Sequence, residues 1–173
     1  MGTLKTNQVI ETTMLARVWS ATIVGIDAVK VGVEVDVSAG GLPGIVVLGL
    51  PDVAIQESRE RVRAMLKNSG YAFPLRKIVV NLTPADLRKE GPSFDLPISV
   101  GILAASEQVS AQLLGDYLFL GEVSLDGSLR SVAGVLPIAA AAKRMGIAGL
   151  VVPADNAQEA AVVKGLAVYG FKH

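Results

Sequence analysis

The chain has 173 residues, a length that suits one domain whose core can fold without metals or disulfides. It has no cysteine and its one histidine is the last residue, His173, which excludes disulfides, thiolate chemistry and zinc–cysteine sites and argues against histidine catalysis. The 16 Lys and Arg residues balance the 16 Asp and Glu residues, so the total charge indicates no particular partner.

The first 13 residues are polar and threonine-rich, without the basic-then-apolar pattern of a signal peptide. We expect residues 1–13 to be a tag or a disordered leader, and residues 14–173 to form a single domain. No apolar run reaches the roughly 18 residues that a membrane-spanning helix needs. We therefore expect a cytoplasmic protein without membrane contact.

Three strands and a helix are predicted at the start of the domain. The strands are expected at residues 19–26, 29–37 and 45–50; the second alternates Val with polar or glycine residues, the period of a strand with one buried face. Residues 39–44 are a glycine-rich turn without the lysine of a phosphate-binding loop. Pro51 and Asp52 are typical of a helix start, and apolar residues at helical spacing predict a helix that ends near Gly70.

Strands and helices alternate in the rest of the chain. The strands are expected at residues 77–82, 117–123, 128–132, 150–152 and 166–169, and the helices at residues 94–107, 133–145 and 155–164. Asp126-Gly127 is a hairpin signal, and Asp155 is suited to cap the last helix. Hairpins combined with β-α-β crossovers predict an α/β fold, a mixed-sheet sandwich with packed helices.

Gly91-Pro92-Ser93 forms a turn that opens onto an apolar helix. A serine needs a base and an oxyanion hole to act as a nucleophile, and the free backbone N–H groups of a helix N-terminus can supply that hole. The alternative interpretation is that Ser93 is the N-cap of a helix that begins at Phe94, with Asp95 in its first turn. Residue type alone favours the N-cap.

Together with Gly121-Glu-Val-Ser-Leu-Asp-Gly127, this turn resembles the proteolytic domain of the Lon family. In that family the serine of Gly-Pro-Ser is the nucleophile, and a lysine in the helix after the second motif is the base. An ungapped alignment places Leu136 at the lysine position. Lys143 follows seven residues later, roughly 10 Å along a helix, which is too far. The resemblance implies a Lon-like fold of the ribosomal-protein second-domain-like superfamily. It also implies that the chain has no catalytic residues, because Leu136 replaces the lysine that would activate Ser93.

Further motifs are similar to the N-terminal domain of the ComM/YifB family of magnesium-chelatase-like, competence-related AAA+ ATPases. They are Gly41-Leu-Pro-Gly44, Leu48-Gly-Leu-Pro-Asp52, Asn81-Leu-Thr-Pro-Ala-Asp-Leu87 and Phe94-Asp-Leu-Pro-Ile98. The resemblance implies a hexameric motor on DNA, in the ComM case a branch-migration helicase. No Gly-x-x-x-x-Gly-Lys-[Ser/Thr] motif occurs, so no cofactor is expected in this chain, and ATP and Mg²⁺ are expected only in an AAA+ module absent from this sequence.

Basic residues concentrate between positions 59 and 89, where the only acidic residues are Glu60 and Asp86. The basic residues are Arg59, Arg61, Arg63, Lys67, Arg76, Lys77, Arg88 and Lys89. Such a cluster is a candidate contact for DNA or for an acidic protein partner, and the alternative is a solvated helix face with loop lysines. We expect no aromatic stacking partner among these residues, which weakens the case for single-stranded nucleic acid.

We therefore expect a non-catalytic, Lon-like domain of a ComM/YifB-type ATPase that aids assembly, DNA engagement or partner engagement in DNA processing such as branch migration. Its expected partners are the AAA+ module of the same protein, further copies in a hexamer, and DNA. Two alternatives stay open at this point: a Lon-like serine peptidase, and a magnesium-chelatase-related subunit of tetrapyrrole synthesis.

Overall fold

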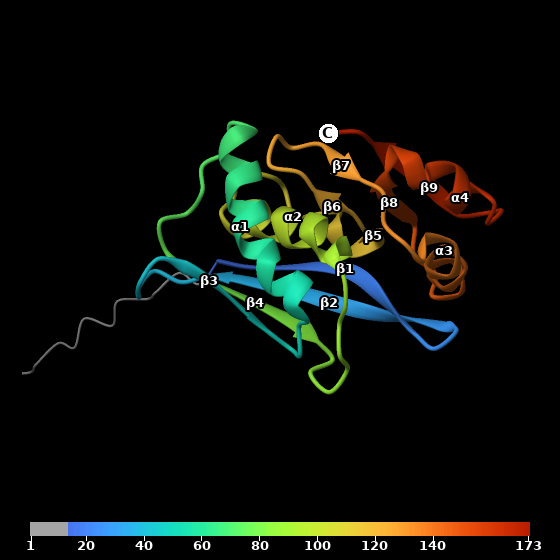
Figure 1. The fold of residues 1–173 in the computed structure, drawn as a ribbon, viewed down its shortest axis with the longest axis horizontal. Helices are drawn as coiled ribbons and strands as arrows, with labels where there is room; N and C mark the ends of the chain where they lie inside the picture. The colour runs from blue at the N-terminus through green and yellow to red at the C-terminus, as the bar shows by residue number, and fades with distance from the viewer. Residues whose placement is uncertain (1–13) are drawn as a thin grey trace, which may run out of the picture.

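A seven-stranded mixed sheet forms the centre of residues 14–173, the part of the chain that the computed structural model describes (Figure 1). The strand order is β3-β4-β2-β1-β5-β8-β9. The long strands β1 (Met14–Val24), β2 (Asp27–Val37) and β4 (Lys77–Thr83) pair antiparallel. The shorter strands β3 (Gly44–Leu48), β5 (Tyr117–Phe119), β8 (Gly149–Pro153) and β9 (Ala167–Phe171) each join a neighbour in parallel. The predicted α/β fold with a mixed sheet is confirmed.

Two pairs of helices cover this sheet. One pair packs on one face of β1, β2 and β4, and the other pair packs on the opposite face, around β5 and β8. The larger core cluster packs α1 (Val53–Asn68) and α2 (Asp95–Ala105) onto β1, β2 and β4. The second cluster packs α3 (Val135–Arg144) and α4 (Ala157–Ala161) around β5 and β8. Because neighbouring residues of a strand point to opposite faces, Phe119 belongs to the first cluster and Leu118 to the second.

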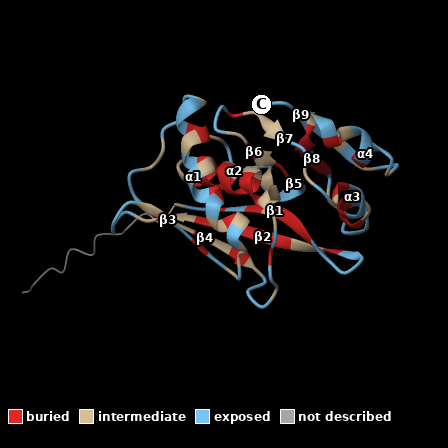
Figure 2. Ribbon diagram, in the orientation of Figure 1, coloured by how far each residue is buried: buried red, intermediate tan, exposed pale blue. Residues whose placement is uncertain are grey.

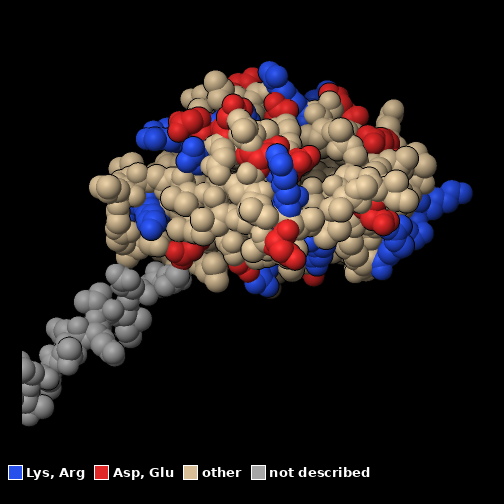
Figure 3. Space-filling view, turned by 60° about the horizontal axis from the view of Figure 1, so that its bottom comes forward, with Lys and Arg blue, Asp and Glu red and all other residues tan. Residues whose placement is uncertain are grey.

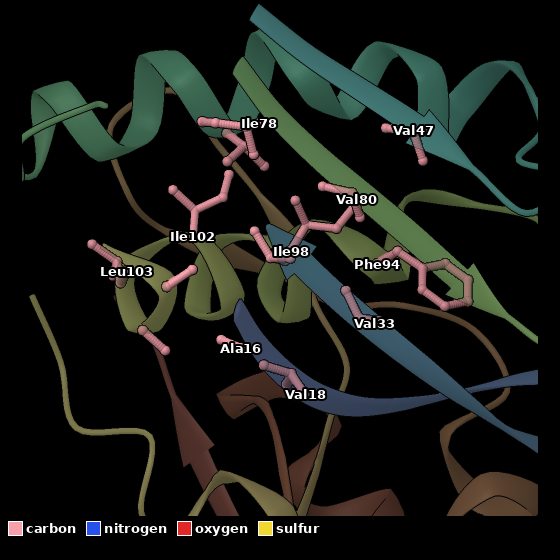
Figure 4. Close-up of a cluster of buried hydrophobic side chains, with 14 of the residues drawn as sticks. Ala16, Val18, Val33, Val47, Ile78, Val80, Phe94, Ile98, Ile102 and Leu103 are labelled. Carbon is pink, nitrogen blue, oxygen red and sulfur yellow. The ribbon is translucent and has the colours of Figure 1, made fainter. Parts of the chain in front are cut away.

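Helix α2 is the centre of the larger core, since it is buried between α1 and the sheet along nearly its whole length (Figure 2). Figure 4 shows Ile98 and Ile102 on the side of α2 that faces Ile78 and Val80 of β4. The helix also lies close to β2, because a Cβ atom at Gly101 would come within 2.5 Å of the side chain of Val35. A substitution at Gly101 would therefore push α2 off the sheet.

Asp52 determines where α1 begins and what lies beside that end. Its Oδ1 accepts a hydrogen bond of 2.9 Å from the amide of Ile55, which makes Asp52 the N-cap of α1. The sequence predicted a helix start at Pro51 and Asp52. The Oδ2 of Asp52 accepts a second bond, also of 2.9 Å, from the amide of Gly91. One carboxylate therefore joins the start of α1 to the Gly-Pro-Ser turn.

The face of β1, β2, β4 and β3 that points away from α1 and α2 carries rows of paired side chains. One row joins Arg17, Glu34 and Asn81, and hydrogen bonds from Arg17 and Asn81 lower the pKa of Glu34. In the next row Trp19 lies opposite Gly32, and the Lys30 ammonium is 3.7 Å from the centre of the indole ring. Further along the same face, Ala21 of β1 and Ala28 of β2 belong to the second core cluster.

Two of the strands predicted from the sequence differ from those in the structure. Strand β1 begins at Met14 rather than at residue 19, because the charged Arg17 interrupts the apolar run that would have marked its start. The predicted strand over 117–123 is two strands, β5 and β6 (Glu122–Val123), which pairs with β7 (Leu129–Arg130). Between β5 and β6 the chain turns towards α2, where Gly121 bonds to other backbone groups.

The expected cap of the last helix is also wrong. Asp155 lies in the 3₁₀ turn Ala154–Asn156, and the residue before α4 makes no side-chain capping bond. The expectation for residues 1–13 lies outside the described residues. Within residues 14–173, every helix falls short of the length and apolar character that crossing a bilayer would require.

Candidate functional site

Ser93 lies in the 3₁₀ turn Pro92–Phe94, directly before α2. Its carbonyl accepts a hydrogen bond of 3.0 Å from the amide of Gly121. Its hydroxyl bonds to no group in residues 14–173, and the N-cap position of α2 is taken by Phe94, which has no side-chain capping bond. The interpretation of Ser93 as a helix N-cap is therefore wrong.

Backbone N–H groups at the start of α2 are used within the protein. The amide of Asp95 donates to the carbonyl of Pro92, and the amide of Leu96 donates to the carbonyl of Gly121 at 3.0 Å. The third residue of the helix is Pro97, which has no N–H. The first turn of α2 therefore offers few donors to a developing oxyanion.

The charged group next to Ser93 is Asp95, and it is fully buried. Its carboxylate accepts two bonds from Arg61, at 2.8 Å from Nε and 3.0 Å from Nη2, and further bonds from the hydroxyl of Ser58 and the amide of Val123. The hydrogen bond with Asp95 raises the pKa of the Arg61 guanidinium. This fork-shaped ion pair ties α1 to α2 and to β6.

Lys89 is the buried lysine of the segment before Ser93, and it bonds to backbone carbonyls. Its Nζ donates hydrogen bonds to the carbonyl of Gly49, at 2.8 Å, and to the carbonyl of Pro84. Its backbone amide donates to the carbonyl of Leu50, and its backbone carbonyl accepts from the amide of Asp52. Burial lowers the pKa of its ammonium group. Lys89 therefore fastens the loop after β4 to the loop before α1.

Leu136 is the second residue of α3, with 41% of its surface exposed. Its amide donates to the Glu159 carboxylate at 3.1 Å, and its aliphatic side chain has no group that can accept a proton. Lys143 lies in the last turn of α3 and is exposed, as predicted. Neither residue supplies a base to the Ser93 hydroxyl by any hydrogen bond within residues 14–173.

Of the basic residues between 59 and 89, three follow one another along the exposed side of α1: Arg59, Arg63 and Lys67. Arg59 Nε donates to the carbonyl of Gln56 at 2.8 Å, and the Arg63 guanidinium lies 5.6 Å from the centre of the Phe73 ring. None of the three forms an ion pair with a residue in 14–173. We call them the α1 row.

The other five basic residues lie elsewhere. Arg61 and Lys89 make the internal contacts described above, and Arg88 pairs with Glu90 at 3.1 Å. Arg76 is exposed beside a hollow that Pro74 and Gln108 also line, and the stem of Lys77 lies against Gly41. The structure therefore brings together three of the eight predicted patch residues.

A cavity of about 270 Å³ opens beside the α1 row, between α1, the start of β3 and the loop before β4. Its lining residues are Pro43, Gly44, Ile45, Arg59, Glu60, Arg63, Phe73, Pro74 and Leu75. A second hollow shares Glu60 and Arg63 with it and continues to Lys67 and Asn68. On the face shown in Figure 3, by contrast, basic and acidic side chains are interspersed.

Phe73 is the site residue that the sequence-based prediction missed. We expected no aromatic side chain among the basic residues, and this was wrong, because the loop after α1 folds back and places the Phe73 ring beneath Arg63. Phe73 also faces the core, since it packs against the larger hydrophobic cluster. The available signal was the aromatic-proline pair Phe73-Pro74 between two groups of basic residues.

The fold and the Gly-Pro-Ser turn define the class as an α/β domain similar to part of Lon protease. Over 121 residues, or 68% of this chain, it is 27% identical to Lon protease of Leptospira interrogans, of which it covers 14%. A family model described as subunit ChlI of Mg-chelatase matches residues 33–156, and the chain belongs to this family.

Two relatives are considerably more similar than Lon protease. The chain is 45% identical to YifB of Salmonella typhimurium over 86% of its own length, and 43% identical to the competence protein ComM of Haemophilus influenzae over 90%. It spans 29% of the length of YifB and 30% of the length of ComM. The predicted similarity to ComM and YifB is therefore confirmed.

Proposed function

We propose that this chain is a non-catalytic domain of a ComM/YifB-type, magnesium-chelatase-like ATPase, and that it holds nucleic acid against the α1 row. The observation that carries the proposal is the row itself, in which Arg59, Arg63 and Lys67 recur every four residues without an acidic partner in residues 14–173. A regular line of cations on an exposed helix is suited to the repeated phosphates of a polynucleotide.

The surroundings of Ser93 support the non-catalytic part. A serine nucleophile needs a base and an oxyanion hole. The resemblance to Lon puts Leu136, which cannot act as a base, at the lysine position, and the first amides of α2 are bonded to Pro92 and Gly121. The chemistry of a motor would be supplied by an AAA+ module outside this sequence, with its own ATP and Mg²⁺, acting with further copies in a hexamer.

Charge reversal of the α1 row tests the proposal. We expect Arg59→Glu, Arg63→Glu and Lys67→Glu together to abolish binding of a labelled single-stranded DNA in a fluorescence anisotropy titration at low salt. If each residue contacts one phosphate, the α1 row accounts for about 2 units of the slope of log affinity against log salt that the unmodified chain shows with a single strand. The control carries Lys143→Glu, Arg144→Glu and Lys164→Glu, which make the same change in charge on exposed residues near α3 and α4.

Binding that survives in the α1-row variant, or that falls equally in the control, contradicts the proposal. An isolated domain that binds no DNA at low salt contradicts it as well. The experiment uses the chain as given, at concentrations high enough to detect weak binding, because a hexamer would add avidity that a single domain lacks.

A further inference from the structure

We infer that the cavity beside the α1 row receives one unpaired base of a single-stranded nucleic acid, whose phosphates lie along Arg59, Arg63 and Lys67. The inference rests on the proposed function and adds to it the form of nucleic acid and the place where a base is held. It begins from the lining of the cavity, in which an apolar part and two guanidinium groups lie side by side.

The apolar part is contributed by the loop before β4 and by the second residue of β3. Ile45, Phe73, Pro74 and Leu75 line it, and Leu75 is 76% exposed. A volume of about 270 Å³ is just below the roughly 300–1,000 Å³ of pockets that hold small molecules. The cavity is therefore suited to a single flat ring rather than to a larger ligand.

The cations favour a polymer with repeated charges over a single phosphorylated group. Residues four positions apart on a helix are separated by about 6 Å along its axis, so the α1 row extends over roughly 12 Å. Successive phosphates of one strand rise by about 3.4 Å along the axis of duplex DNA, and they lie farther apart in an extended single strand. The row can thus face several consecutive phosphates, whereas a lone phosphate would engage one end of it.

The second hollow provides a path for the backbone on either side of the held base. It begins at Glu60 and Arg63, which also line the cavity, and ends at Lys67 and Asn68. A strand that follows it would remain within reach of the α1 row. The one acidic lining residue, Glu60, would repel a phosphate but can accept a hydrogen bond from an exocyclic amino group of a base.

A single strand fits this arrangement better than a duplex. In a duplex the bases are stacked and paired, so none can enter a cavity beside the phosphate contacts, whereas unpaired bases can pack on aromatic side chains and guanidinium planes. Arg63 offers both kinds of surface to an unpaired base, because its guanidinium plane lies over the aromatic ring of Phe73 at the cavity.

The test compares two labelled strands of the same length and charge, roughly 10 nucleotides each, within the site sizes of single-strand-binding proteins. One strand carries all its bases, and in the other they are replaced by abasic sites. We expect the base-bearing strand to bind about tenfold more tightly, the lower part of the range for one stacked base. A duplex of the same length should bind no better than the abasic strand.

The matched variants are Leu75→Asp, which changes the exposed lining of the cavity, and Leu42→Asp, which makes the same change on a residue that is 89% exposed and does not line it. Leu75→Asp should reduce the affinity for the base-bearing strand to that for the abasic strand, while Leu42→Asp should preserve the difference. Both positions are exposed, so folding should be unaffected.

The outcomes separate the two proposals. Equal affinities for base-bearing and abasic strands, or equal affinities for single strand and duplex, overturn the inference and leave phosphate binding by the α1 row intact. A preference for bases that Leu75→Asp does not change also overturns it. Absence of binding to all three nucleic acids at low salt overturns the proposed function itself.

Discussion

Arg61 and Arg63 are two residues apart on α1, and the difference between their surroundings separates the two faces of this helix. Arg61 points inward and donates two hydrogen bonds to the buried carboxylate of Asp95. Arg63 points outward over Phe73, with no ion pair in residues 14–173. The inner face therefore holds the fold together, and the outer face is available to a ligand. Both residues carry the same charge, so their roles are distinguished only by their burial and by their hydrogen-bond partners.

The largest effect is expected at the inner face. Asp95→Ala would leave the Arg61 guanidinium and the amide of Val123 without their acceptor, and breaking a buried ion pair in this way costs about 3–5 kcal/mol. Because part of Arg61 reaches solvent, we expect a value near the lower limit. Urea denaturation of both proteins measures this loss in the free energy of unfolding. A loss of less than about 1 kcal/mol would show that the pair does not join α1 to α2.

A second prediction applies one conservative change to both faces. Arg61→Lys removes the fork with Asp95 and should destabilise the protein by about 1–2 kcal/mol, since an ammonium group cannot reproduce two parallel bonds. Arg63→Lys should alter stability by less than about 0.5 kcal/mol, as is usual for surface substitutions. Thermal unfolding of the two variants side by side provides the comparison. Similar losses would erase the distinction between the faces.

A third prediction concerns the exposed ion pair of Arg17 and Glu34, which lies on the sheet and not on α1. Since the folded pKa of Glu34 is lowered, its interactions stabilise the protein above the reference pKa of 4.5, and this contribution disappears as the pH falls through the folded value. Glu34→Gln should therefore cost less than about 1 kcal/mol at neutral pH and almost nothing at strongly acidic pH. Unfolding curves at both pH values measure this. A loss that grows on acidification would contradict the sign.

The smallest effect is expected at Ser93. Ser93→Ala should change neither stability nor any measured property, because the hydroxyl makes no hydrogen bond in residues 14–173. Both proteins should leave an unfolded protein substrate intact over long incubation, as judged by gel electrophoresis. Turnover by the unmodified chain that disappears in Ser93→Ala would demonstrate a peptidase and end the non-catalytic proposal.

Most elements could be predicted from the sequence, because their signals are local. The alternating valines predicted β2, and Asp52 predicted the start of α1. The break between β5 and β6 could not be predicted, since it depends on Gly121, which donates a hydrogen bond to Ser93 and accepts one from Leu96, both far away in the sequence. Local signals therefore gave the elements, and contacts between distant segments set several of their ends.

The candidate site was only partly predictable for the same reason. The spacing of Arg59, Arg63 and Lys67 placed them on one side of a helix. The same spacing places Arg61 on another side of the helix, but its role depends on a carboxylate 34 positions later, which the sequence pattern does not reveal. Phe73 was missed because a ring in a loop carries no periodic signal. The direction of each charged side chain followed from packing, which the sequence pattern does not contain.

The shared carboxylate of Asp52 has a consequence for motion. One of its oxygens bonds to Ile55 and the other to Gly91, so the beginning of α1 and the Gly-Pro-Ser turn cannot separate without breaking one of these bonds. The two segments should open together, and the amide protons of Ile55 and Gly91 should exchange with solvent at coupled rates. A load applied to the outer face of α1 would reach the segment before α2 through this side chain, as well as through the ion pair of Arg61 and Asp95.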